Sequence, residues 1–132
     1  MMRKMLRSKI HQATVTHSEL MYEGSLTIDS DLLAAVNLYP YEHVQVYNIN
    51  NGARFDTYAI EGPAGSGAIG LNGAAARKGL VGDLIIIVSY ALYSREDLES
   101  YEPMVVILDR NNRIRKRGES LFHESSIVQE DR

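Results

Sequence analysis

The sequence predicts a mainly β domain, a small barrel or sandwich with a few short helices. Short runs of β-branched and aromatic residues are separated by turn residues, which is typical of such all-β folds. The helical patterns are each about two turns or less, too short to be stable alone in water. The chain has 132 residues, the size of one domain. We therefore expect a single domain with a core built from strands.

The predicted strands are runs of apolar, β-branched or aromatic residues. Residues 50–53 (NNGA) join two of these runs, and Asn-Gly is a strong signal for a hairpin. Residues 83–90 (DLIIIVSY) are almost continuously apolar, which predicts a strand buried on both faces. The complete set of predicted strands is 9–15, 44–49, 55–60, 68–72, 83–90 and 104–108.

Three short helices are expected between the strands. Residues 29–31 (DSD) can cap a helix over 32–36, residues 73–78 are rich in alanine, and residues 94–97 (SRED) form a capping-box pattern. From residue 110 the composition becomes strongly charged. We therefore expect a domain over residues 1–109, followed by a mobile C-terminal tail over 110–132 with room for one docked segment.

The composition excludes several kinds of chemistry. There is no cysteine, which removes thiolate catalysis, cysteine-based zinc sites and structural disulfides, and favours a reducing, cytoplasmic location. Lys and Arg number 14 against 17 Asp and Glu, a net charge of −3, which disfavours a nucleic-acid or membrane-surface partner. The longest apolar run is too short to span a membrane, and residues 1–20 lack the apolar block of a signal peptide.

The glycine-rich stretch 62–70 satisfies the pattern G-x-G-x-x-G of dinucleotide-binding loops. That pattern requires a helix that begins on the glycines, but the following residues are apolar and end in the turn Asn72-Gly73. We therefore expect a flexible loop between strands. The four histidines have no helical metal-ligand spacing, so no metal site is predicted.

The dipeptide Gly24-Ser25 is usually no more than a turn, but it can carry a specific chemistry. A serine hydroxyl can attack the preceding carbonyl where the peptide is bent, and glycine permits the required dihedrals. An ester results, elimination then cleaves the chain, and hydrolysis leaves an N-terminal pyruvoyl ketone. A cysteine-free chain would thereby acquire a covalent electron sink.

Five blocks of sequence carry a resemblance to a known family. They are residues 5–11 with 15–16 (MLRSKIH, VT), 22–29 (YEGSLTID), 51–60 (NGARFDTYAI), 72–77 (NGAAAR) and 82–83 (GD). In this order and spacing they resemble bacterial aspartate 1-decarboxylase, a pyruvoyl-dependent lyase of pantothenate biosynthesis that forms β-alanine. The resemblance covers residues 1–90, with weaker similarity to about residue 108.

The resemblance implies a six-stranded double-psi β-barrel in a homotetramer, with active sites between neighbouring subunits. It implies a zymogen that cleaves itself between Gly24 and Ser25 into residues 1–24 and 25–132. Ser25 would become the pyruvoyl group, which forms a Schiff base with the amine of L-aspartate. The resemblance leaves open whether a maturation factor is needed.

The resemblance also implies roles for individual residues. Tyr58 would be the proton donor, and Thr57 would bind substrate and stabilise the oxyanion at the Gly24 carbonyl. Lys9 and Arg54 are candidates for binding the substrate carboxylates, because Lys offers a point charge and Arg a bidentate fork. The remaining residues that would line the pocket are Asn72, Gly73, Ala74 and Ala75.

Two further hypotheses compete with this one. The chain could be a non-catalytic double-psi barrel that serves as a binding or assembly module, or an RNA-associated protein that uses the basic residues 110–117. Strand periodicity also raises a conflict, because Thr57 and Tyr58 point to opposite faces of a regular strand. We therefore expect this strand to serve two subunits at once.

Overall fold

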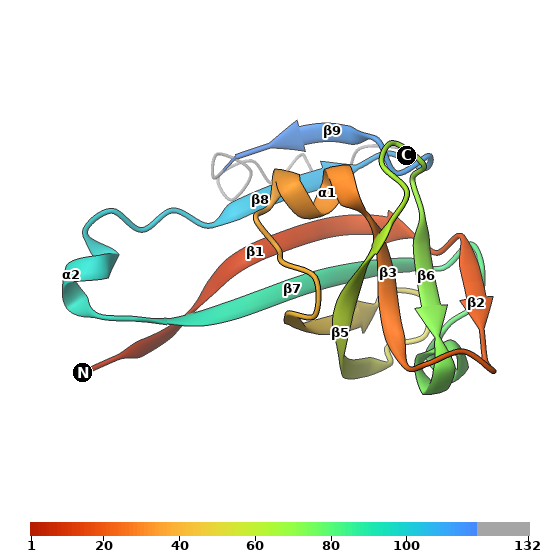
Figure 1. Cartoon of the computed structure of the whole chain (residues 1–132). Coiled ribbons are helices and arrows are strands. Elements are labelled where there is room, and N and C mark those ends of the chain that lie inside the picture. The colour runs from red at the N-terminus through yellow and green to blue at the C-terminus, as the bar shows by residue number, and fades with distance from the viewer. Residues whose placement is uncertain (119–132) are drawn as a thin grey trace.

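The computed structural model describes residues 1–118, in which nine strands form one hydrogen-bonded sheet (Figure 1). The mainly β fold with short helices is confirmed and is consistent with the double-psi β-barrel that the resemblance implies. The order of the strands in the sheet is β2-β6-β3-β5-β4-β7-β1-β8-β9. Their bounds are β1 Arg3–Thr14, β2 His17–Glu19, β3 Ser25–Asp29, β4 His43–Asn48, β5 Arg54–Gly62, β6 Ile69–Asn72, β7 Leu84–Tyr93, β8 Met104–Leu108 and β9 Ile114–Arg117.

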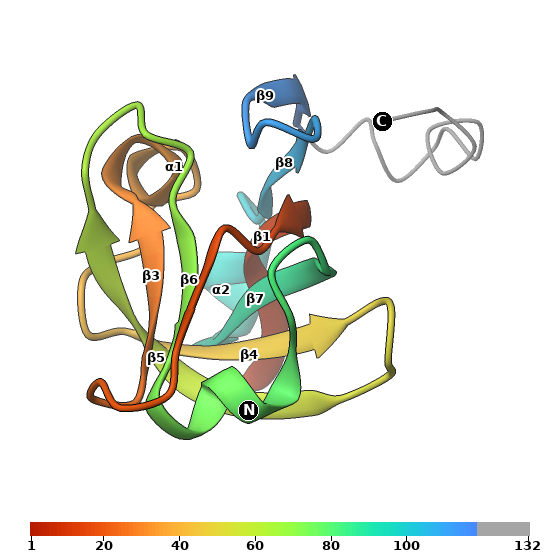
Figure 2. The same ribbon diagram turned by 90° about the vertical axis from the view of Figure 1, so that its right-hand side faces the viewer.

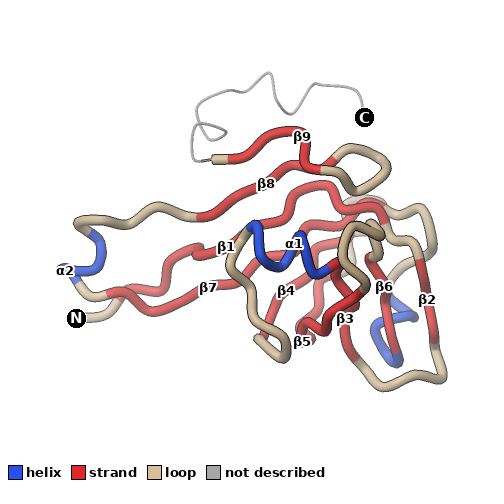
Figure 3. The backbone as a smooth tube through the Cα atoms, turned by 45° about the horizontal axis from the view of Figure 1, so that its top comes forward, coloured by secondary structure: helices blue, strands red, loops and turns tan. Residues whose placement is uncertain are grey.

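Strands β3, β5 and β6 form one side of the fold, and β4 crosses behind them toward β7 and β1 (Figure 2). β1 and β7 are the longest antiparallel pair and extend away from the rest of the molecule toward α2 (Figures 1 and 3). The core is apolar and contains side chains from most strands and from α1. Its fully buried large side chains are Ile10, Leu26, Ile28, Ile69, Leu71, Ile85, Ile87, Leu108, Val15, Val36, Val44 and Val46.

Local sequence signals explain all three helices. In α1 (Ser30–Ala35) the Asp29 carboxylate caps the first turn by accepting a hydrogen bond from the Asp31 N–H. The alanine-rich segment forms η1 (Gly73–Lys78), a 3₁₀ helix that begins directly after β6. In α2 (Arg95–Leu98) Ser94 and Asp97 form the predicted capping box, with both reciprocal hydrogen bonds present.

Several predicted boundaries differ from the observed ones. β1 is longer than expected, because it pairs with β7 as far back as Arg3. The predicted burial of residues 83–90 on both faces holds only in part: Ile87, Val88 and Ser89 are buried, but Leu84 and Ile86 are half-buried and Tyr90 is exposed. The sheet does not end at residue 109, because β9 pairs with β8 and continues it. Residues 119–132 of the expected tail lie outside the described residues.

The glycine-rich loop between β5 and β6 is anchored rather than flexible. The buried Asp29 carboxylate accepts hydrogen bonds from the Gly65 and Gly67 N–H groups, at 3.0 and 2.8 Å. Asn112, which follows β8, donates to the Gly67 carbonyl and to the Thr14 carbonyl, at 2.7 and 2.9 Å. The loop is therefore fixed by two buried side chains from distant segments, a pattern that composition alone does not reveal.

Candidate active site

The segment before β3 brings an exposed glycine next to a buried serine. Gly24 is exposed, whereas Ser25, the first residue of β3, is only 1% exposed. The Ser25 hydroxyl donates to the Glu23 carbonyl at 3.3 Å and accepts from the Asn72 side-chain nitrogen at 3.0 Å. Gly24 does not have a positive φ, and a Cβ there would meet no atom within 4 Å. The chain bends at Gly24, as the self-cleavage chemistry requires, without a left-handed φ.

The start of η1 lies directly against this segment. Gly73 has a φ of +64°, a left-handed conformation that suits glycine. A Cβ on Gly73 would lie 2.7 Å from the Gly24 nitrogen and Cα and from the Tyr22 carbonyl oxygen. Only a glycine therefore lets the Gly24 backbone approach η1 so closely.

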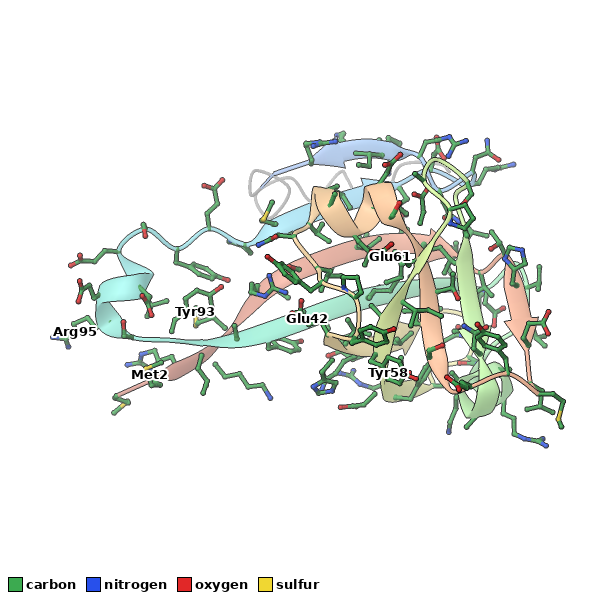
Figure 4. All side chains as sticks on the ribbon, in the orientation of Figure 1. Met2, Glu42, Tyr58, Glu61, Tyr93 and Arg95 are labelled. Atoms are coloured by element: carbon green, nitrogen blue, oxygen red, sulfur yellow. The ribbon has the colours of Figure 1, made fainter. Side chains whose placement is uncertain are left out.

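Gly24 also lines a cavity of about 350 Å³ with residues of β5 and η1. Figure 4 labels Tyr58 near the lower edge of the ribbon, where β3 begins. The cavity brings together five of the predicted site residues, because Thr57, Tyr58, Ala74 and Ala75 line it with Gly24. Asn72 instead contacts Ser25 directly and lines a neighbouring cavity of about 450 Å³.

β5 changes its neighbouring strand next to Thr57 and Tyr58. β5 pairs with β4 as far as Tyr58 and with β3 from Ala59 onward. The strand therefore changes its neighbour between Tyr58 and Ala59, directly after two residues that line the cavity. Thr57 and Tyr58 line this cavity with Gly24 within a single chain, but Ser25 is not among the lining residues, so the expectation that β5 serves two subunits stays a prediction.

The two predicted carboxylate-binding cations do not line this cavity. The Arg54 guanidinium lies over the Tyr47 ring, 4.0 Å from its centroid. Lys9 is half-buried on β1 opposite Val88, and burial lowers the pKa of its amine. Both belong to the β1-β7-β4-β5 part of the sheet.

Three lining residues were not identified from the sequence. Phe55, Asp56 and Lys78 complete the cavity, and Lys78 is the one cation among its described lining residues. Asp56 is also within 2.7 Å of the His43 Nε2 atom. Lys78 ends the alanine-rich segment whose first residues were expected at the site. Its position on the same short helix was the available signal.

Among the described residues, no group of three or more His, Cys, Asp or Glu side chains could hold a metal ion. In the same part of the chain, no helix is both long and apolar enough to cross a membrane.

The chain is similar to known proteins over most of its length. A family model described as "Aspartate decarboxylase" matches residues 1–115. Aspartate 1-decarboxylase of Desulfotalea psychrophila is 57% identical over 116 residues, which cover 88% of this chain and 98% of that protein. Aspartate 1-decarboxylase of Syntrophobacter fumaroxidans is 58% identical over 118 residues, which cover 89% of this chain and 95% of the relative.

The fold and the site thus define a class of protein, a mainly β domain in which a buried serine directly follows an exposed glycine. The extent of the family match identifies the particular group. The chain belongs to the aspartate decarboxylase family.

Proposed function

We propose that this chain decarboxylates L-aspartate to β-alanine and carbon dioxide, using a pyruvoyl group that it makes from Ser25. The family supports the reaction. The position of Ser25 supports the proposed pyruvoyl group: Ser25 is buried, directly follows the exposed Gly24, and Gly24 lines a cavity with Thr57 and Tyr58.

The residues present fit the self-cleavage that such a group requires. The Ser25 Oγ atom attacks the Gly24 carbonyl carbon, the Gly24–Ser25 C–N bond breaks, and an ester forms. Loss of the Ser25 Cα proton then breaks the Cβ–Oγ bond and releases Gly24 as a carboxylate. Hydrolysis of the dehydroalanine left behind releases ammonia and produces the ketone. Thr57, which lines the cavity with Gly24, supplies a hydroxyl donor for the oxyanion of the first step.

In the decarboxylation step the pyruvoyl ketone supplies an electron sink for the electron pair left by carbon dioxide. The chain's own residues bind, orient and protonate. Tyr58 holds the proton that replaces the carboxylate. The small side chains of Ala74 and Ala75 leave the backbone of η1 open to an anionic substrate, and Lys78 adds a positive charge to the same cavity.

We further propose that the active enzyme is a homotetramer, in which Lys9 and Arg54 reach the substrate carboxylates from a neighbouring copy. Two observations support this assembly. Neither cation lines the cavity of its own chain, although both lie on one part of the sheet. Large apolar side chains on both sides of the site are exposed in the single chain, Met21 at 94% and Leu80 at 73%.

Mass analysis of the purified protein, combined with an assay for β-alanine, tests the proposal. The wild type should separate into residues 1–24 and 25–132 and form β-alanine from L-aspartate. The non-catalytic barrel hypothesis predicts an intact chain and no product.

A further inference from the structure

The side-chain nitrogen of Asn72 lies between two hydroxyl groups of β3. It is 3.0 Å from the Ser25 Oγ atom and 2.8 Å from the Thr27 Oγ1 atom. Both contacts follow from the sheet, because Asn72 pairs with Ser25 across β6 and β3, and Thr27 is two residues further on the same face. An amide nitrogen carries two hydrogens, so it can donate to both hydroxyls at once.

Thr27 is the rigid member of this group. On one side a Cβ added to Gly70 would lie 3.3 Å from the Thr27 Cβ atom. On the other, a Cβ added to Gly62 would lie 2.9 Å from its Cγ2 atom. Two glycines on the neighbouring strands therefore form a slot for this side chain. A β-branched residue in a strand is already restricted at χ1, so the slot fixes the direction of the hydroxyl.

Asn72, in contrast, is adjustable. The terminal torsion of an asparagine is broad, so the hydrogen bonds of the buried Asn72 amide help to decide where it points. Its contact with Ser25 matters because, among residues 1–118, the Ser25 hydroxyl otherwise has only the 3.3 Å bond to the Glu23 carbonyl. That bond must be given up when the hydroxyl loses its proton and Oγ attacks the Gly24 carbon. The Asn72 N–H can hold Oγ in place throughout this step.

We propose that Thr27 is a positioning residue for self-cleavage: its hydroxyl anchors the Asn72 amide, which in turn holds the Ser25 Oγ atom. This inference rests on the proposed function. Thr27→Val keeps the shape that fits between Gly62 and Gly70 but places a methyl group against the amide. Cleavage should slow by about 3- to 10-fold, the factor that one neutral hydrogen bond contributes.

The rate constant for cleavage is measured on freshly translated full-length chains, by following the appearance of the 25–132 fragment. Thr27→Ser keeps the hydroxyl and should cleave within about twofold of the wild-type rate. Thr16→Val is the matched control: Thr16 also exchanges hydrogen bonds with β6, at Ile69, but does not contact Asn72. It should cleave at the wild-type rate.

A double-mutant cycle with Asn72→Ala tests whether Thr27 acts through Asn72. In that background Thr27→Val should have no further effect. Should Thr27→Val fail to fold, Thr27→Ala removes the same hydroxyl and should show the same slowing. The inference is overturned if the folded variant cleaves at the wild-type rate, if Thr16→Val slows cleavage equally, or if Thr27→Val has its full effect without Asn72. A wild-type chain that never cleaves would overturn the proposed function, and this inference with it.

Discussion

Gly73→Ala should slow self-cleavage because the new side chain collides with the backbone of the cleavage site. A control glycine with the same backbone conformation but no such contact separates this effect from backbone strain. Gly73 has a φ of +64°, and an L-residue in this left-handed conformation costs about 1–2 kcal/mol. The new Cβ would also lie 2.7 Å from the Gly24 nitrogen and Cα, whereas ordinary contact begins at 3.4 Å. The Gly24 segment must therefore move by several tenths of an ångström. Misplacement of about 1 Å can cost a factor of 10² in rate, so we expect cleavage to slow by about 10-fold or more.

Gly52→Ala is the matched control for this substitution. Gly52 also has a left-handed backbone, with a φ of +77°, but no atom lies within 4 Å of the position of its Cβ. In a Ser25→Ala background, which cannot cleave, both substitutions should lower Tm by roughly 3–10 °C. Only Gly73→Ala should slow cleavage when Ser25 is present, as followed by intact mass over time. Equal cleavage rates for Gly73→Ala and the wild type would refute the proposed contact.

Three further predictions concern catalysis and pH. Tyr58→Phe should leave self-cleavage intact but lower turnover of L-aspartate by about 10²-fold or more; unchanged turnover would remove Tyr58 as proton donor. Burial raises the pKa of Glu42, but hydrogen bonds from the Tyr39 N–H, the Ser89 hydroxyl and Arg7, with the charge of Arg7, outweigh it and lower the pKa below 4.5. Glu42 therefore stabilises the fold above pH 4.5, and this contribution is lost as the pH falls through the lowered pKa. In Glu42→Gln the free energy of unfolding should fall less steeply with decreasing pH than in the wild type. An unchanged pH dependence would contradict the lowered pKa. Burial lowers the pKa of the Lys9 amine below 10.5, so the charged amine destabilises the fold at pH 7, and this destabilisation disappears as the pH rises toward 10.5. Lys9→Met should therefore raise Tm at pH 7 while weakening L-aspartate binding. A lowered Tm would contradict this.

The parts of the fold that could be predicted from the sequence depend on local signals. Asn51-Gly52 predicts the turn between β4 and β5 because a left-handed glycine suits a tight hairpin, and Gly52 has that conformation. The capping box at Ser94 likewise acts within four residues. β3 was not predicted, because five residues carry little pattern and their partners in β5 and β6 lie far along the chain.

The candidate site shows the same division. Gly24, Ser25, Thr57 and Tyr58 could be predicted because the family resemblance preserves their short motifs. Lys78 was missed: its place at the end of the alanine-rich segment was a signal, but whether it lines the cavity depends on how η1 packs beside β5. The roles of Gly62 and Gly70 were hidden as well. Both belong to the stretch expected to be a flexible loop, yet they form the slot that holds Thr27.

The most direct test of this account is the intact mass of the wild type and of Ser25→Ala after prolonged incubation. The wild type should give two fragments, residues 1–24 and 25–132. Their summed mass should equal the mass of the precursor plus one water minus one ammonia, as formation of a ketone from Ser25 requires. Ser25→Ala should remain a single chain and form no β-alanine. An uncleaved wild type that still decarboxylates L-aspartate, or an active Ser25→Ala variant, would contradict the account.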